Sequence, residues 1–307
     1  MNNDIELAAE GVKRVILASA PERIEDFNHI WKEYNPQIVF TKDKKDFSIQ
    51  AGPFNSIIFN HKTMCKIWIL GFAMQKAFNA YSSLLAMAQL LRFNISDTTF
   101  NDDELIEAEA EIQSLISSVL NLADLECIDD FQWPENIPLP IGKPKDLEGS
   151  LVFDLLCMAA AYCFLHELQH VIINASGEEI KPTEEEMRCD EFARKFLLAH
   201  IEEYSKVSGY PLMAVKNKRA MSIALATVVI LVFTPKKNWY GSITHPSVGQ
   251  RILALTDYLN LSENDLFWSY FSSLLLSQIR RDRIKLEDLI IQNQKDFCLQ
   301  LINLLNK

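Results

Sequence analysis

The stretch His166-Glu167-Leu168-Gln169-His170 reads H-E-x-x-H, and the fold of this chain is organised around it. Positions i and i+4 lie on one face of a helix, so two imidazoles can point at the same place. Glu167 is rotated from that face by about a third of a turn, where it can reach a water on a shared metal ion. The alternative is a pair of core histidines on a buried helix, each satisfied by a hydrogen bond.

The surrounding sequence predicts a buried helix. Residues 151–173 are rich in Leu, Met, Ala, Phe and Cys and contain neither proline nor glycine. Such uniform apolarity is typical of a helix that is enclosed on most sides. The run Ala175-Ser176-Gly177 predicts its end, and Lys181-Pro182 opens a second helix that continues to Leu198.

A catalytic zinc ion usually has three protein ligands and one water, so a third ligand is needed. A histidine in the pattern H-E-x-x-H-x-x-G-x-x-H would require Gly at 173 and His at 176, where this chain has Ile173 and Ser176. An acidic residue near or on the second helix is the alternative. The candidates by residue type are Glu178, Glu179, Glu184, Glu185, Glu186 and Asp190.

Helical periodicity favours Glu186 as the third ligand. Four residues share a stripe at i, i+4, i+7 and i+11: Glu186, Asp190, Ala193 and Leu197. Glu184 and Glu185 are then expected to face water, and a carboxylate on the buried stripe must be paired or bound to metal. Asp190 is expected to orient a ligand histidine through a hydrogen bond. The other interpretation is a capping box, in which Thr183 and Glu186 cap their own helix.

Composition excludes several functional classes. The chain has 307 residues, 49% hydrophobic and 23% charged, which is ordinary for a globular protein of one large or two small domains. Its net charge of -11 argues against nucleic acid or an anionic membrane as the main partner. The six cysteines are scattered singly and no secretory signal is recognisable, which indicates a reduced, cytoplasmic protein.

The N-terminal part of the chain predicts helices and one small sheet. Residues 1–35 read as mostly helical. Residues 37–41 and 47–50, joined by a polar turn at 42–45, predict a β-hairpin, and residues 56–59 predict a further strand. Such a sheet either supports the helices or offers its edge to an extended peptide.

The remaining segments are read as helices and one long loop. Residues 63–93 and 102–125 predict helices, and the proline-rich residues 134–146 predict an extended loop. This loop and the 63–93 helix are candidate walls of a narrow cleft, although a rigid connector is the simpler role for the loop. Residues 220–233 are uncharged but too short to span a bilayer, which favours a core helix over a membrane-inserting segment.

Three motifs together resemble a known family. After H-E-x-x-H, the chain carries Glu186-Met187-Arg188-Cys189-Asp190-Glu191-Phe192-Ala193, and then Thr244-His245-Pro246-Ser247 with Arg251-Ile252. This set resembles the gluzincin-type zinc peptidases. By size, by motif order and by its cytosolic character, the whole chain is most similar to the Lit-type phage-exclusion peptidases.

The resemblance implies an α+β, mainly α-helical fold with a zincin-like metalloprotease core and a small N-terminal β-sheet. We expect residues 1–150 to form an N-terminal helical region with the small sheet and the proline-rich loop, and residues 151–307 to carry the peptidase helices. The two parts are expected to form one compact unit. The resemblance implies Zn²⁺ held by His166, His170 and Glu186, with Glu167 as general base. His245 is expected to stabilise the oxyanion, and Asp190 and Arg251 to support the ligands.

The resemblance also implies a substrate and a trigger. It indicates cleavage of translation elongation factor Tu during phage infection, with a phage-derived peptide as trigger. Two other functions stay open from the sequence: a repressor-cleaving regulatory peptidase, and a non-catalytic zinc-binding scaffold of the same fold.

Overall fold

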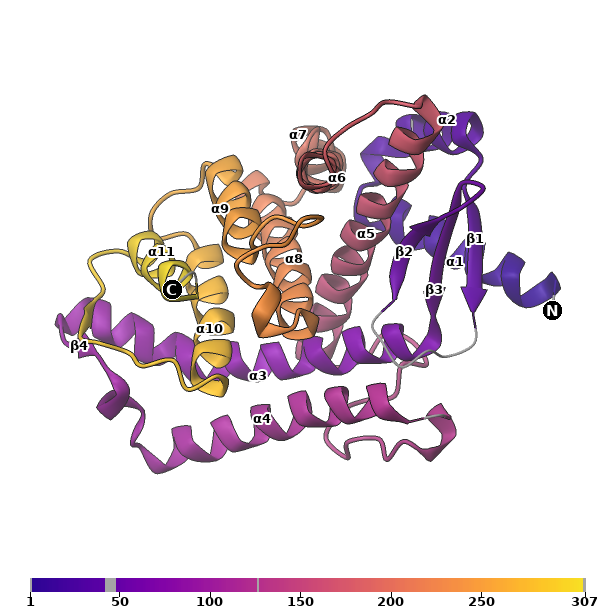
Figure 1. The fold of residues 1–307 in the computed structure, drawn as a ribbon. Coiled ribbons are helices and arrows are strands. Elements are labelled where there is room, and N and C mark those ends of the chain that lie inside the picture. Colours follow the sequence, from indigo (N-terminus) through magenta and orange to yellow (C-terminus); the bar gives the residue numbers. More distant parts are fainter. Residues whose placement is uncertain (1, 42–47, 126, 306–307) are drawn as a thin grey trace.

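The computed structural model describes residues 2–41, 48–125 and 127–305, where helices predominate beside a small sheet (Figure 1). The predicted α+β, mainly helical class is confirmed. In chain order the α-helices are α1 (Asn2–Ser19), α2 (Ile24–Tyr34), α3 (His61–Leu91), α4 (Asp103–Asp124), α5 (Leu147–Ser176), α6 (Pro182–Leu198), α7 (Ile201–Ser208), α8 (Leu212–Phe233), α9 (Val248–Leu259), α10 (Leu266–Arg281) and α11 (Gln294–Leu305).

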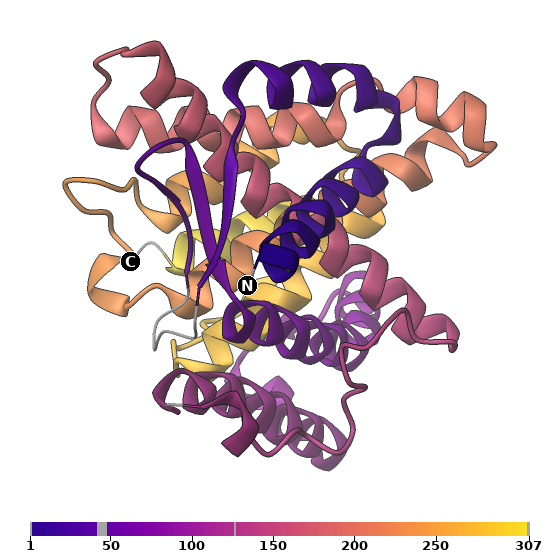
Figure 2. The same ribbon diagram turned by 90° about the vertical axis from the view of Figure 1, so that its right-hand side faces the viewer.

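Three strands stand side by side at one side of the molecule (Figure 2): β1 (Gln37–Thr41), β2 (Ile49–Gly52) and β3 (Ser56–Asn60). Their order is β1-β3-β2, with β1 parallel and β2 antiparallel to β3. The predicted hairpin between the first two strands is therefore wrong, because the hairpin joins β2 to β3. The chain reverses direction between these two strands in a tight turn at residues 53–55. The predicted turn at 42–45 lies outside the described residues.

Helix α5 is the centre of the fold and carries the H-E-x-x-H stretch. The Asp146 side chain accepts a hydrogen bond from the Gly149 N–H at its start, and Gly177 ends it with φ 68°, a conformation that glycine adopts without strain. Among the described residues, α5 alone is long and apolar enough to cross a membrane, and 72% of that apolar window is buried inside the molecule. Such burial is typical of the core helix of a soluble protein.

The elements around α5 fix the position of the site. Helix α6 packs along one side of α5, α8 along another, and the strands β2 and β3 along a third (Figure 1). Helix α6 begins at Pro182 with Lys181 as its N-cap residue, so Thr183 lies inside the helix and no Thr183–Glu186 capping box forms. The Glu186 side chain is thereby left to point toward α5.

The predicted helices at 63–93 and 102–125 correspond to α3 and α4, which lie side by side beneath the rest of the molecule (Figure 1). The proline-rich loop packs against α3, where the Trp68 indole donates a hydrogen bond to the Pro138 carbonyl. Most of residues 220–233 are buried in α8, as expected of a core helix. A second, two-stranded sheet pairs β4 (Asn94–Ile95) with β5 (Leu289–Ile290).

Candidate metal and catalytic site

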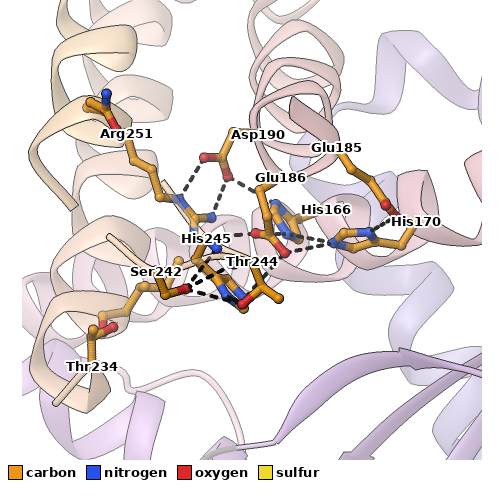
Figure 3. Close-up of polar contacts among 12 residues, drawn as sticks. His166, His170, Glu185, Glu186, Asp190, Thr234, Ser242, Thr244, His245 and Arg251 are labelled. Carbon is orange, nitrogen blue, oxygen red and sulfur yellow. Dashed lines mark hydrogen bonds and ion pairs between the residues drawn. The ribbon is translucent and has the colours of Figure 1, made fainter. Parts of the chain in front are cut away.

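The two histidines of the H-E-x-x-H stretch face each other across one turn of α5 (Figure 3). Their Nε2 atoms are 3.2 Å apart, and the rings meet edge to face at 71°. The geometry follows from the i, i+4 spacing of His166 and His170 on a helix. Both inner nitrogens therefore converge on one point beside α6.

A carboxylate of α6 orients each of these imidazoles from its outer side. The Nδ1 of His166 donates to Asp190 Oδ1 at 3.0 Å, and the Nδ1 of His170 donates to Glu185 Oε1 at 2.7 Å. When the rings are neutral, these bonds leave each Nε2 with a lone pair that can bind a metal ion. The expectation that Glu185 faces water is wrong, because the first turn of α6 runs close enough to α5 for this side chain to reach His170.

Glu186 lies between the two inner nitrogens. Its Oε2 is 3.4 Å from His166 Nε2 and its Oε1 is 3.4 Å from His170 Nε2. The residue is buried, whereas its neighbour Glu184 is exposed and pairs with Arg188 at the surface. A buried carboxylate needs such partners, so the stripe that sequence periodicity predicted does turn inward.

Asp190 is the hub of the polar network behind His166. Its two oxygens accept hydrogen bonds from Arg251 Nε and Nη2 at 2.7 and 2.6 Å, and Oδ1 also accepts from the Tyr162 hydroxyl at 2.9 Å. Sequence analysis did not single out Tyr162. Its signal was present nonetheless, since Tyr162 precedes His166 by four residues and so shares its helix face.

The network fixes the charge states of the site. Burial alone would lower the pKa of His166, but hydrogen bonds to Asp190 and Glu186 outweigh it and raise the pKa to about 10. Burial likewise opposes charge on His170, yet Glu186 and Glu185 raise its pKa to about 9. Burial would raise the pKa of Glu186, but the two histidines hold it well below its usual range.

Glu167 points to the strand side of the site. Its Oε2 accepts a hydrogen bond from the main-chain N–H of Ala51 in β2 at 2.7 Å. Burial raises the pKa of this carboxyl, and the charges of His166 and His170 lower it in part. A raised pKa suits a group that must take up and then release a proton near neutral pH.

Cys189 is a further possible metal ligand that the sequence analysis did not weigh. Its sulfur lies in one group with ring nitrogens of His166 and His170, all within 4.8 Å of one another. The residue is fully buried, and burial raises the pKa of the thiol to about 12. The structure therefore brings two different third ligands, Glu186 and Cys189, to the histidine pair.

His245 approaches the same carboxylate from the segment between α8 and α9. Its Nε2 is 3.4 Å from Glu186 Oε1, and 59% of its side chain is exposed. The segment is held by local bonds, since the Ser242 side chain accepts from the His245 N–H at 3.0 Å and the Ser242 N–H donates to the His245 carbonyl at 2.8 Å. Six of the seven predicted site residues thus lie in one connected cluster (Figure 3), and the seventh, Glu167, lines the same cavity.

A cavity of about 580 Å³ opens onto this cluster. Its walls come from β2, α5, α6, α8, α9 and the segment between α8 and α9. Neither residues 134–146 nor residues 63–93 line it, so the predicted cleft walls are wrong. A second cavity, of about 920 Å³, shares Ser242, His245 and Pro246 with the first and continues between α6 and α9.

Comparison with known proteins identifies the class. A family model described as Peptidase U49 matches residues 57–271. The match covers more than half of the chain and includes α5, α6 and the start of α9 with its arginine, so the chain belongs to the U49 family of peptidases. No curated protein and no solved structure matches it.

Proposed function

We propose that this chain is a zinc-dependent endopeptidase with a zincin-like core. The observation that carries the proposal is the convergence of His166 Nε2, His170 Nε2 and the Glu186 carboxylate within 3.4 Å of one another beside Glu167. Two neutral imidazoles and a carboxylate are the usual protein ligands of a catalytic zinc ion. The outer hydrogen bonds of both imidazoles support the same assignment.

We favour Glu186 over Cys189 as the third ligand. The two Glu186 oxygens face one inner nitrogen each, at equal distances of 3.4 Å. The pKa of Glu186 is held low, so it is already an anion, whereas the Cys189 thiol would have to lose its proton against a pKa of about 12. His166, His170 and Glu186 leave a fourth position for water, as a hydrolytic site requires.

Each site residue then has a separate role in the proposed hydrolysis. Zinc held by His166, His170 and Glu186 would supply Lewis-acid chemistry, polarising the scissile carbonyl and lowering the pKa of a water toward neutrality. Glu167 takes the proton of the attacking water and delivers it to the leaving amine. His245, from the far side of Glu186, donates a hydrogen bond to the oxygen on which negative charge develops. Arg251 and Tyr162 hold Asp190, which in turn orients His166.

The shape of the cleft supports cleavage within a chain. Ile49 and Ala51 of the edge strand β2 line the first cavity, so an extended peptide can run beside that strand. Beyond His245 the second cavity offers room for the continuation of the same peptide. We therefore infer an endopeptidase that acts on a protein segment.

For the substrate we propose translation elongation factor Tu, cleaved in the cytoplasm during phage infection with a phage-derived peptide as trigger. This proposal is supported by the resemblance of the motif order to the Lit-type peptidases. It is tested by adding the purified protein to elongation factor Tu with and without an infected-cell lysate. Cleavage only with the lysate is expected, and no cleavage in either case would contradict it.

The proposed reaction is tested with Glu167→Gln. The variant should bind about one zinc per chain, as the wild type does, yet lose about 10²- to 10⁴-fold in cleavage rate because only the proton transfer is removed. It should also retain uncut substrate in a pull-down. A zinc-binding scaffold without catalysis would instead show equal behaviour of the wild type and the variant, and a protein that takes up no zinc would overturn the proposal.

A further inference from the structure

The hairpin that ends beside the active site has an unusual turn. Phe54 and Asn55 both have φ of 57°, and the Ser56 N–H donates to the Pro53 carbonyl at 3.3 Å. Two central residues with positive φ define a type I′ turn, whose twist matches that of the strands it connects. The three residues Pro53, Phe54 and Asn55 connect the paired Gly52 and Ser56, so this turn fixes the pairing register of β2 against β3.

The register decides which main-chain groups of β2 face the cleft. Ala51 stands opposite Ile57, and Gln50 stands opposite Ile58. In an antiparallel pair, successive residues alternate between bonding to the partner strand and pointing away from it. The Ala51 N–H bonds to Glu167, so Ala51 belongs to the outward-facing set and Gln50 to the set bonded to β3. A slip by one residue would reverse these roles.

The outward N–H of Ala51 is the hydrogen bond that orients Glu167. Oε2 accepts it at 2.7 Å, and the described residues supply Glu167 with no other hydrogen-bond donor. A side chain with three rotatable bonds would otherwise sample several rotamers in the cleft. With Oε2 held by the strand, the carboxylate stays beside the cavity that Glu167, His166 and His170 line together.

We propose that the main-chain N–H of Ala51 is a positioning group for the general base, and that the I′ turn at Phe54–Asn55 sets it in place through the register of β2. The role in catalysis rests on the function proposed above, whereas the hydrogen bond and its register do not. The site then has a main-chain component, contributed by a strand that lies outside the 57–271 match to the family model.

The hydrogen bond is tested in the metal-free protein by amide hydrogen exchange, which needs neither zinc nor substrate. Glu167→Ala should speed exchange at the Ala51 amide by at least about 10-fold, because an edge amide without its acceptor is open to water. The Gln50 amide, bonded to β3, should keep its rate. Glu185→Ala, a carboxylate deletion on the other side of the site, should leave Ala51 unchanged.

Three results would overturn the proposal in this experiment. They are an unchanged rate at Ala51 in Glu167→Ala, an equal acceleration at Gln50, and an equal acceleration in Glu185→Ala. The second would mean that the strand loosens as a whole, and the third that the whole site does. None of them bears on zinc binding or cleavage, so this test fails or succeeds apart from the proposed function.

The catalytic consequence is tested with Ala51→Pro, which removes the N–H. Proline is tolerated on an edge strand where the N–H points away from the sheet. The variant should lose about 10- to 100-fold in kcat, the usual effect of a misplaced catalytic group, with KM and zinc affinity changed by less than about threefold. A raised KM with unchanged kcat would mean that this amide binds substrate, and would contradict a positioning role.

Discussion

The helical side and the strand side of the cleft build the site by different means. Helices α5 and α6 contribute side chains, and every ring nitrogen of His166 and His170 has a partner on α6 or on the facing ring. Strand β2 contributes a single main-chain N–H, from Ala51 to Glu167. The helical side therefore holds its residues through a network of charges, whereas the strand side holds Glu167 through one hydrogen bond.

This difference has an energetic consequence. In a buried charge network, removal of one partner leaves the others uncompensated and costs about 3–5 kcal/mol. A single hydrogen bond to a charged group contributes about 1.5–3 kcal/mol. Changes on the helical side should therefore affect metal binding strongly, whereas changes in the β2–β3 hairpin should affect the general base or the stability of the hairpin more mildly.

The largest effect is expected from Glu186→Ala. This change removes the carboxylate that faces both inner nitrogens, so zinc affinity should fall by more than the roughly 10- to 100-fold that is typical of groups behind the ligands. Competition with a chelating dye measures it. Glu184→Ala is the matched control, since Glu184 pairs only with surface Arg188 in this structure and should keep wild-type affinity. Equal affinity of both variants would contradict the ligand assignment.

Zinc binding should also depend steeply on pH. The pKa values of His166 and His170 are raised to about 10 and about 9, so the metal-free pair holds protons at pH 7 that a zinc ion must displace. A ligand imidazole must be neutral, so binding at pH 7 should release at least about one proton, and affinity should rise with pH until the pair is fully deprotonated. Calorimetry in buffers of different ionisation enthalpy measures the release. Affinity that is the same at low and high pH would refute this charge assignment.

Glu185→Ala should have a smaller effect than Glu186→Ala. It removes the acceptor behind His170 but no ligand, so zinc affinity should fall by about 10- to 100-fold. Glu185→Gln keeps an oxygen that accepts the Nδ1 hydrogen bond and should recover part of that loss. The same dye competition serves here. A wild-type affinity for Glu185→Ala would mean that the 2.7 Å contact with His170 contributes nothing.

The smallest effect is expected in the hairpin. Phe54 has φ of 57° and is 93% exposed, so it bears the cost of a left-handed conformation without a compensating contact. Phe54→Asn should raise the free energy of unfolding by about 1 kcal/mol, since Asn tolerates this conformation better. Ile243, which is 92% exposed, is not among the residues with positive φ, and Ile243→Asn should give no such gain. Urea unfolding measures both, and equal shifts would rule out relief of strain as the cause.

The two sides of the cleft also differ in how far the sequence predicts them. Helix periodicity was sufficient to predict that His166, His170, Glu186 and Asp190 lie close together. Both the residue types and their spacing can be seen in the sequence. Glu185 was assigned to the wrong face, since a long side chain in the first turn of α6 reaches across to α5. Periodicity gives the direction in which a side chain leaves its own helix. It does not tell how close a neighbouring helix lies, and so whether a long side chain can reach it.

The strand side could not be predicted in the same way. The role of Ala51 belongs to its main chain, which is alike in every residue but proline, so no side-chain pattern marks it. It depends on the register of β2, and the register depends on a turn built from Phe54 and Asn55 rather than from the usual Asn-Gly pair. Tyr162 is an intermediate case. The sequence predicts which face of the helix it occupies, but not its hydrogen bond to Asp190, because Asp190 lies on another helix.

The most direct test of the zinc site is X-ray absorption at the zinc edge of the loaded protein. Ligation by His166, His170, Glu186 and one water should give a shell of nitrogen and oxygen at about 2.0–2.1 Å, with no sulfur. The same spectrum is expected from Cys189→Ala. A sulfur at about 2.3 Å that disappears in Cys189→Ala would show ligation by the thiol and contradict the proposed ligand set.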